Sequence, residues 1–121
     1  MKTRLSRTFT FDAAHRLTDY QGACGRIHGH TYTLVITVEG ELDSRGMVID
    51  FFDLKILVEE SIISRLDHTY LNDMYSQPTV EIIAGDIFHT MRQKLGDLNP
   101  TVTLYSVQLW EGEKSYVEVF S

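Results

Sequence analysis

The segment from His30 to Leu42 places the strongest constraint on the fold, because its side chains alternate in character. Apolar or aromatic residues stand at the even positions Tyr32, Leu34, Ile36 and Val38, and the odd positions hold mostly threonine. A period of two with β-branched and aromatic residues predicts a strand with one buried face and one solvated face. Such strands are typical of an antiparallel sheet that is covered on one side only.

Three further segments have the composition of strands. They run from Arg4 to Ala13, from Thr101 to Trp110 and from Lys114 to Phe120. The sequence Glu111-Gly112-Glu113 is typical of a turn and joins the last two into a hairpin. Asp43-Ser44-Arg45-Gly46 predicts another turn, directly after the second strand.

Two amphipathic helices are expected between these pairs of strands. Asp50 and Thr79 are positioned as N-caps, and Gly96 is placed to end the second helix. The two apolar stripes are Phe51, Leu54, Val58 and Ile62, then Val80, Ile83, Ala84, Ile87, Met91 and Leu95. The order ββααββ predicts one α+β domain over residues 1–121. In this domain a four-stranded antiparallel sheet carries two helices packed on one face.

Composition narrows the classes of partner and the cellular setting. Hydrophobic residues make up 43% of the 121 residues, and no apolar run approaches the ~20 residues that a membrane helix needs. The formal net charge of −6 argues against non-specific binding to nucleic acid or to an anionic membrane. Cys24 is the single cysteine, so no intramolecular disulfide can form. Met1-Lys2-Thr3-Arg4 is not followed by the apolar segment of a secretory signal, so we expect no such signal and a cytoplasmic location.

Three histidines carry the sharpest chemical signal. His28 and His30 are two residues apart, so both imidazoles point to one face if they begin the second strand. Hairpin pairing would bring His15, at the end of the first strand, beside them. Imidazoles suit Zn²⁺, and three protein ligands without a fourth leave the open position of a catalytic site. The alternative is three unrelated surface histidines.

Cys24 has three possible roles at this point. A lone cysteine is most often a small buried hydrophobe, although Cys24 stands in a polar, glycine-containing stretch. A neighbouring metal or imidazolium would make its thiol a usable base or nucleophile. As a fourth zinc ligand it would instead close the site and remove catalysis.

Acidic residues supply the remaining candidates. Asp67 and His68 end the first helix, where a carboxylate is unfavourable, and together they form a pair suited to proton transfer. Glu81 lies in the first turn of the second helix, where negative charge is favoured in any case. Glu111 ends a strand, where its carboxylate could accept two hydrogen bonds from a heterocycle edge. His89 has no comparable neighbours and is interpreted as structural.

Taken in order, these motifs resemble the 6-pyruvoyl-tetrahydropterin synthase / 6-carboxy-tetrahydropterin synthase family, which has the tunnelling fold. Any one motif is weak, but the ordered set is specific and spans nearly the whole chain. The matching segments are Phe11–His15, Cys24–His30, Gly46–Phe51 with Leu54-Lys55, Leu66–His68 with Tyr70–Asp73, Pro78-Thr79 with Glu81, and Glu111.

The resemblance implies a role for each candidate. Zinc would be held by His15, His28 and His30. The catalytic residues would be Cys24 as thiolate and Asp67 with His68 as the proton-transfer pair. Glu111 would anchor the 2-amino-4-oxo edge of a pterin, with Thr79 and Glu81 lining or supporting the pocket. Family members form homo-oligomers of stacked rings, often hexamers, with active sites between subunits.

The spacing from Cys24 to His28 most resembles the bacterial 6-carboxy-tetrahydropterin synthases of queuosine biosynthesis. These convert 7,8-dihydroneopterin triphosphate to 6-carboxy-tetrahydropterin, with release of acetaldehyde and triphosphate. Three alternatives stay open: a 6-pyruvoyl product, direct side-chain cleavage to 6-hydroxymethyl-dihydropterin, or a non-catalytic zinc or pterin-binding module. Gly112 departs from the family, which usually has threonine after the anchoring glutamate. Arg16 and Arg26 could meet the triphosphate or simply be solvated surface residues.

Overall fold

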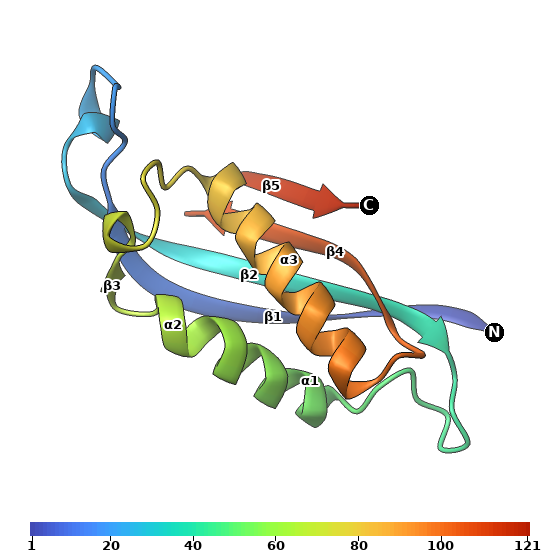
Figure 1. Ribbon diagram of the computed structural model, residues 1–121. Helices are drawn as coiled ribbons and strands as arrows, with labels where there is room; N and C mark the ends of the chain where they lie inside the picture. Colours follow the sequence, from blue (N-terminus) through green and yellow to red (C-terminus); the bar gives the residue numbers. More distant parts are fainter.

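A computed structural model describes residues 1–121 and contains one five-stranded sheet (Figure 1). The strands are β1 Lys2–His15, β2 His28–Glu41, β3 Thr69–Tyr70, β4 Thr103–Glu111 and β5 Ser115–Phe120. They lie in the order β3-β1-β2-β4-β5, with antiparallel β1–β2, β2–β4 and β4–β5 pairs. The α+β class and the two hairpins are therefore confirmed.

The prediction of four strands, all antiparallel, is wrong at one edge of the sheet. There β3 pairs in parallel with Ala13 and Ala14 of β1, so the sheet is mixed. A two-residue strand is too short to show any periodicity in the sequence. It forms because the chain returns alongside β1, where the backbone N–H of His68 donates to the carbonyl of Asp12.

The strands β1 and β2 make the longest pairing in the sheet. Their register runs from Lys2 opposite Glu41 to His15 opposite His28. Both strands extend beyond the apolar alternation used to predict them, because each satisfies the backbone groups of the other. The extension brings His15 and His28 into the ladder itself.

The buried face of the sheet follows the predicted alternation. The β2 residues Tyr32, Leu34, Ile36 and Val38 are all fully buried. Opposite them, β4 departs from strict alternation, because a register shift between Thr37 and Val38 inserts one extra β4 residue. This bulge puts two consecutive β4 residues, Ser106 and Val107, in the interior.

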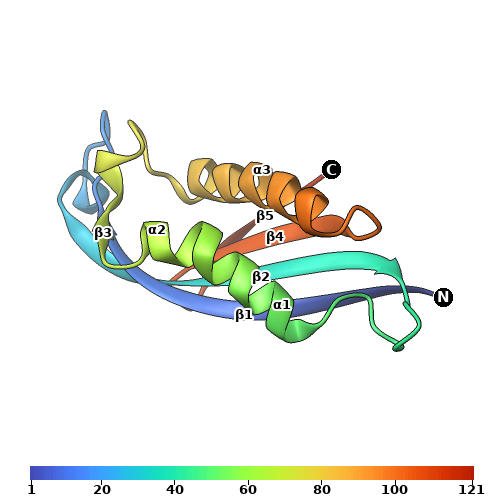
Figure 2. The same cartoon turned by 60° about the horizontal axis from the view of Figure 1, so that its bottom comes forward.

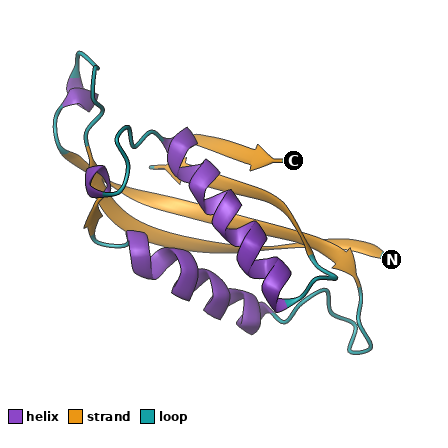
Figure 3. Ribbon diagram, in the orientation of Figure 1, coloured by secondary structure: helices purple, strands orange, loops and turns teal.

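The helices cover a single face of the sheet (Figures 2 and 3). They are α1 Phe51–Val58, a π-helical turn Glu59–Ile63, α2 Ser64–Leu66 and α3 Val80–Leu98, with short 3₁₀ turns at Ala23–Gly25 and Leu71–Asp73. The expected first helix is thus one helical run with a π-turn in its middle. Both predicted N-caps are confirmed, since Asp50 accepts from Phe52 N at 2.8 Å and Thr79 accepts from Ile82 N at 3.2 Å.

Two details of the helices differ from the predictions. Gly96 does not end α3, which continues to Leu98, because Gly96 does not adopt the positive φ that would turn the chain. Phe51, placed in the apolar stripe, is 54% exposed, while Leu54, Val58 and Ile62 are fully buried. No helix of the described chain is long and apolar enough to cross a membrane.

Candidate active site

The three histidines come together at one end of the β1–β2 ladder. His15 is the last residue of β1 and lies directly opposite His28, the first residue of β2. His15, His28 and His30 share the sheet face of Phe11 and Tyr32, as the alternation predicted. Their ring centroids are 4.7 to 5.3 Å apart, and their candidate ligand nitrogens all lie within 4.8 Å of one another.

Hydrogen bonds decide which ring nitrogen two of these histidines can offer. His15 Nδ1 lies 2.8 Å from the carbonyl oxygen of Pro78, and His28 Nδ1 lies 2.7 Å from that of Arg26. Carbonyl oxygens only accept, so Nδ1 carries the hydrogen in each neutral ring and Nε2 keeps its lone pair. This carbonyl contact on the far nitrogen is typical of histidines that bind metals.

Two of the Nε2 atoms make no hydrogen bond in the folded chain. His15 Nε2 and His30 Nε2 are buried without a hydrogen bond, and a buried polar atom without a partner is costly. Burial lowers the pKa of His30, which favours the neutral form that a metal requires. Three converging imidazoles, two of them held with the Nε2 lone pair free, therefore fit a zinc ion.

Glu111, the last residue of β4, adds a carboxylate beside this cluster. Its Oε1 lies 3.3 Å from His30 Nε2, and its Oε2 lies 3.7 Å from His15 Nε2. Glu111 also lines a cavity of about 170 Å³. The rest of that lining consists of Val80, Glu81, Ser115, Tyr116 and Val117. Two of the three predicted pterin-contacting residues thus share one cavity, and Thr79 is the N-cap of the helix that begins beside it.

Cys24 lies in the loop of residues 16–27, which projects beyond the end of the sheet between β1 and β2 (Figure 1). It is partly buried within the 3₁₀ turn Ala23–Gly25. It does not belong to the compact group of metal-ligating side chains, which consists of the three histidines alone. This favours an open site over a closed site with Cys24 as the fourth ligand. Arg16 and Arg26 in the same loop are exposed.

Asp67 and His68 form the predicted pair, just after α2. His68 Nδ1 lies 3.0 Å from Asp67 Oδ2, and Asp67 Oδ1 accepts from the backbone N–H of Asp12 at 3.0 Å. The N–H of Asp12, followed by the imidazole of His68, keeps the pKa of Asp67 below its usual value. These contacts explain why an acidic residue stands at the carboxyl end of a helix.

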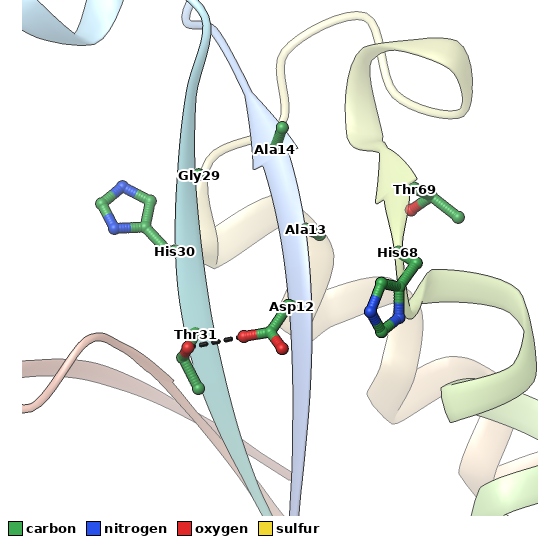
Figure 4. Close-up of a pocket in the computed structure, with 8 residues that line it drawn as sticks. All are labelled: Asp12, Ala13, Ala14, Gly29, His30, Thr31, His68 and Thr69. Carbon is green, nitrogen blue, oxygen red and sulfur yellow. Dashed lines mark hydrogen bonds between the residues drawn. The ribbon is translucent and has the colours of Figure 1, made fainter.

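Within a single chain, Asp67 and His68 do not lie beside the histidine cluster. Asp67 and His68 lie beside Asp12, whose carboxylate accepts from Thr31 on the sheet face opposite to the helices. Figure 4 shows His30 pointing away from Asp12 and His68, although all three border the same shallow cavity of about 460 Å³. The side chain of His68 is 79% exposed.

Several residues of this region were assigned no role from the sequence, although Asn72 and Pro78 lie in the family-like segments Tyr70–Asp73 and Pro78-Thr79. Ser115 and Tyr116 line the cavity of Glu111, and Pro78 orients His15 through its carbonyl oxygen. Asn72 and Gln77 bind the backbone at the start of the loop that carries Cys24. Each of these residue types is common in loops and turns, so only their position in space distinguishes them.

Comparison with known proteins now identifies the class. The sequence profile of the 6-pyruvoyl tetrahydropterin synthase family matches residues 4–121, and the chain belongs to this family. The Caenorhabditis elegans 6-pyruvoyl tetrahydropterin synthase structure superposes with a TM-score of 0.82 at 26% identity, covering 100% of this chain and 96% of that one.

Curated relatives are similar over nearly the whole chain. A 6-carboxy-5,6,7,8-tetrahydropterin synthase from Bacillus subtilis is 38% identical, covering 93% of this chain and 81% of the relative. One from Haemophilus influenzae is 30% identical, with coverages of 95% and 96%. A dihydroneopterin monophosphate aldolase from Pyrococcus furiosus is 38% identical, covering 98% of both chains. Tetrahydropterin synthases thus predominate among these relatives, alongside one aldolase.

Proposed function

We propose that this chain is a zinc-dependent 6-carboxy-5,6,7,8-tetrahydropterin synthase. Its reaction would convert 7,8-dihydroneopterin triphosphate and water to 6-carboxy-tetrahydropterin, acetaldehyde and triphosphate, a step toward 7-deazaguanine compounds such as queuosine. The observation that carries the proposal is the cluster of His15, His28 and His30, in which two buried Nε2 atoms make no hydrogen bond. The relatives named as 6-carboxy synthases support the choice of product.

The metal would be held by His15, His28 and His30 through Nε2. Zinc bound there would supply a Lewis acid for the hydroxyl groups of the substrate side chain. Glu111 stands beside the cluster and lines the adjoining cavity, so its carboxylate would hold the pterin edge next to the metal. Two parallel hydrogen bonds to that edge would fix the orientation of the substrate.

Proton transfer is assigned to Cys24, Asp67 and His68. The Nδ1 atom of His68 is held by Asp67, so its exposed Nε2 is the atom free to take up or release a proton. Cys24 would act as thiolate on the substrate side chain, from a loop that lies beside the histidine ligands in the sequence. This division leaves the three histidines to the metal alone.

A second copy of the chain would complete the site. Asp67 and His68 lie on the sheet face opposite to the metal cluster, and His68 is exposed there. Beyond its short pairing with β3 at Ala13 and Ala14, the outer edge of β1 is unpaired, and so is the outer edge of β5. Unpaired strand edges favour association with further strands. We therefore propose a homo-oligomer, a hexamer by family resemblance, with active sites between subunits.

Product analysis tests the activity. Zinc-loaded protein is incubated with 7,8-dihydroneopterin triphosphate, aldehydes are trapped, and the products are identified by mass spectrometry. Acetaldehyde together with 6-carboxy-tetrahydropterin is the expected result. A 6-pyruvoyl product without acetaldehyde would keep the site but change the reaction. Absence of turnover with zinc bound would contradict the proposal and favour a binding module.

A second candidate function rests on the Pyrococcus furiosus relative, a dihydroneopterin monophosphate aldolase that aligns over 98% of both chains. An aldolase of this kind would cut the side chain directly and leave 6-hydroxymethyl-dihydropterin. Dihydroneopterin monophosphate is therefore assayed in parallel with the triphosphate. Formation of glycolaldehyde phosphate from the monophosphate, with no acetaldehyde from the triphosphate, would favour the aldolase.

A further inference from the structure

Two amide side chains hold the start of the loop that carries Cys24. Asn72 accepts from the backbone N–H of Arg16 at 2.9 Å, and its Nδ2 donates to the carbonyl oxygen of the same residue at 2.9 Å. Gln77 does the same for Thr18: its Oε1 accepts from the backbone N–H at 2.7 Å, and its Nε2 donates to the carbonyl at 3.0 Å. We call Asn72 and Gln77 the amide clamp.

The amide clamp replaces a neighbouring strand. Arg16 and Thr18 follow directly on β1 and are two residues apart, so their backbone N–H and C=O groups point to the same side. An adjacent strand would bind both groups of each residue, and the two side-chain amides do so here. The hydroxyl of Thr18 also donates to Gln77 Oε1 at 2.7 Å. The clamp thus holds the backbone of residues 16–18 where β1 has ended.

The clamped segment in turn holds Cys24. Leu17 lies between the two clamped residues, and its backbone N–H donates to the carbonyl oxygen of Cys24 at 2.7 Å. The loop is closed tightly at the next residue, because a Cβ on Gly25 would lie 2.5 Å from the carbonyl oxygen of Tyr20. A shift of residues 16–18 would therefore move Cys24.

The segment that carries the clamp also touches a metal-ligand candidate. Pro78, next to Gln77, accepts from His15 Nδ1 through its carbonyl oxygen. Residues 72–78 therefore contact both His15 and the residues that hold Cys24. We propose that Asn72 and Gln77 are positioning residues that fix Cys24 relative to the histidine cluster. Only their effect on turnover rests on the proposed function.

Cys24 itself is the probe, because it is the only thiol in the chain. The rate of its alkylation by iodoacetamide at fixed pH is measured on zinc-loaded protein for Asn72→Ala, Gln77→Ala and Gln77→Glu. Loss of the clamp bonds frees the loop to open, so the alanine variants should react about threefold to tenfold faster than the parent. Gln77→Glu keeps an acceptor oxygen but places a charged oxygen against the carbonyl of Thr18 in place of the donor, so its rate should also exceed that of the parent. The control is Gln93→Ala, an exposed amide of α3, which should match the parent.

Circular dichroism and zinc content separate positioning from unfolding. Should one alanine variant fail to fold, the other tests the proposal by itself, because Asn72 and Gln77 hold different residues of the loop. Alkylation within about twofold of the parent for every folded variant would overturn the proposal. If Cys24 is catalytic, the variants whose Cys24 is alkylated faster should also have a lower kcat than the parent, with KM little changed. Faster alkylation with unchanged turnover would uphold the clamp and contradict the catalytic role of Cys24.

Discussion

At the scale of single residues, the hydrogen bonds at Nδ1 of His15 and His28 are the main constraint on how the histidine cluster could bind a metal. With their Nδ1 atoms at the carbonyls of Pro78 and Arg26, the neutral rings of His15 and His28 can offer a metal only Nε2. The backbone thus selects the tautomer of these two candidate ligands. Cys24 does not belong to this group of side chains, so we expect its role to be separable from metal binding.

This separation gives the first prediction. His28→Ala should lose zinc, because two imidazoles remain where three converge. Cys24→Ala should keep zinc and abolish turnover. Metal analysis of the purified variants and the product assay measure the two effects. Loss of zinc from Cys24→Ala would make the cysteine a ligand and contradict an open catalytic site.

The second prediction concerns Glu111. Glu111→Gln removes the charge that strengthens hydrogen bonds to a pterin edge, so KM should rise by about tenfold to a hundredfold with zinc content unchanged. The contrary outcome is loss of zinc, which would make Glu111 a metal ligand, since its oxygens lie 3.3 and 3.7 Å from two Nε2 atoms. Glu113→Gln, an exposed carboxylate of the same turn, is the matched control.

At the scale of elements, one polar contact ties the end of the first helical run to α3. Arg65 of α2 lies 3.0 Å from the carboxylate of Asp86 on α3, and the hydroxyl of Tyr75 donates to the same carboxylate. Burial and this hydrogen bond raise the pKa of Tyr75 to about 12. The segment that carries the amide clamp is therefore also anchored to the helical layer.

The third prediction follows from the sign of that shift. A phenol whose pKa is higher in the folded chain adds stability below its unfolded value of 10.0, and this stability is lost as pH rises toward about 12. Denaturation in urea at several alkaline pH values should show this decline. Tyr75→Phe should be less stable than the parent at neutral pH and show a shallower decline. An equal pH dependence in both proteins would contradict the role of Tyr75.

At the scale of the whole molecule, the separation of the two candidate half-sites is the decisive feature. The histidine cluster faces the helical layer, and Asp67 with His68 stands at the sheet edge toward the other face. If both groups act in one reaction, as we propose, a second copy of the 121-residue chain would bring them together. Symmetric association provides the same contact at every site.

The fourth prediction tests this arrangement by complementation. Cys24→Ala and His68→Ala should each be inactive alone. Mixed oligomers formed by co-expression at equal levels should regain about a quarter of the parent activity. A site works only when its Cys24 comes from a His68→Ala chain and its His68 comes from a Cys24→Ala chain, and each condition holds for about half of the sites. Mixing Asp67→Asn with His68→Ala is the control, since both changes lie in the same half-site and should restore nothing. No recovery in the first mixture would place both half-sites on one chain.

Features that depend on local periodicity and on capping residues were predictable from the order of the amino acids. The alternation from Tyr32 to Val38 predicts the buried face of β2. The side chains of Asp50 and Thr79 cap the two helices at the predicted positions. The sequence also placed His28 and His30 on one face, because strand geometry is regular.

Contacts between distant segments were visible only in the folded chain. These contacts include the parallel strand β3 and the bulge beside Thr37. They also include the bonds of Asn72 and Gln77 to the loop of Cys24. All of these features depend on hydrogen bonds or strand pairings between residues far apart in sequence. A local sequence pattern does not identify the distant partner.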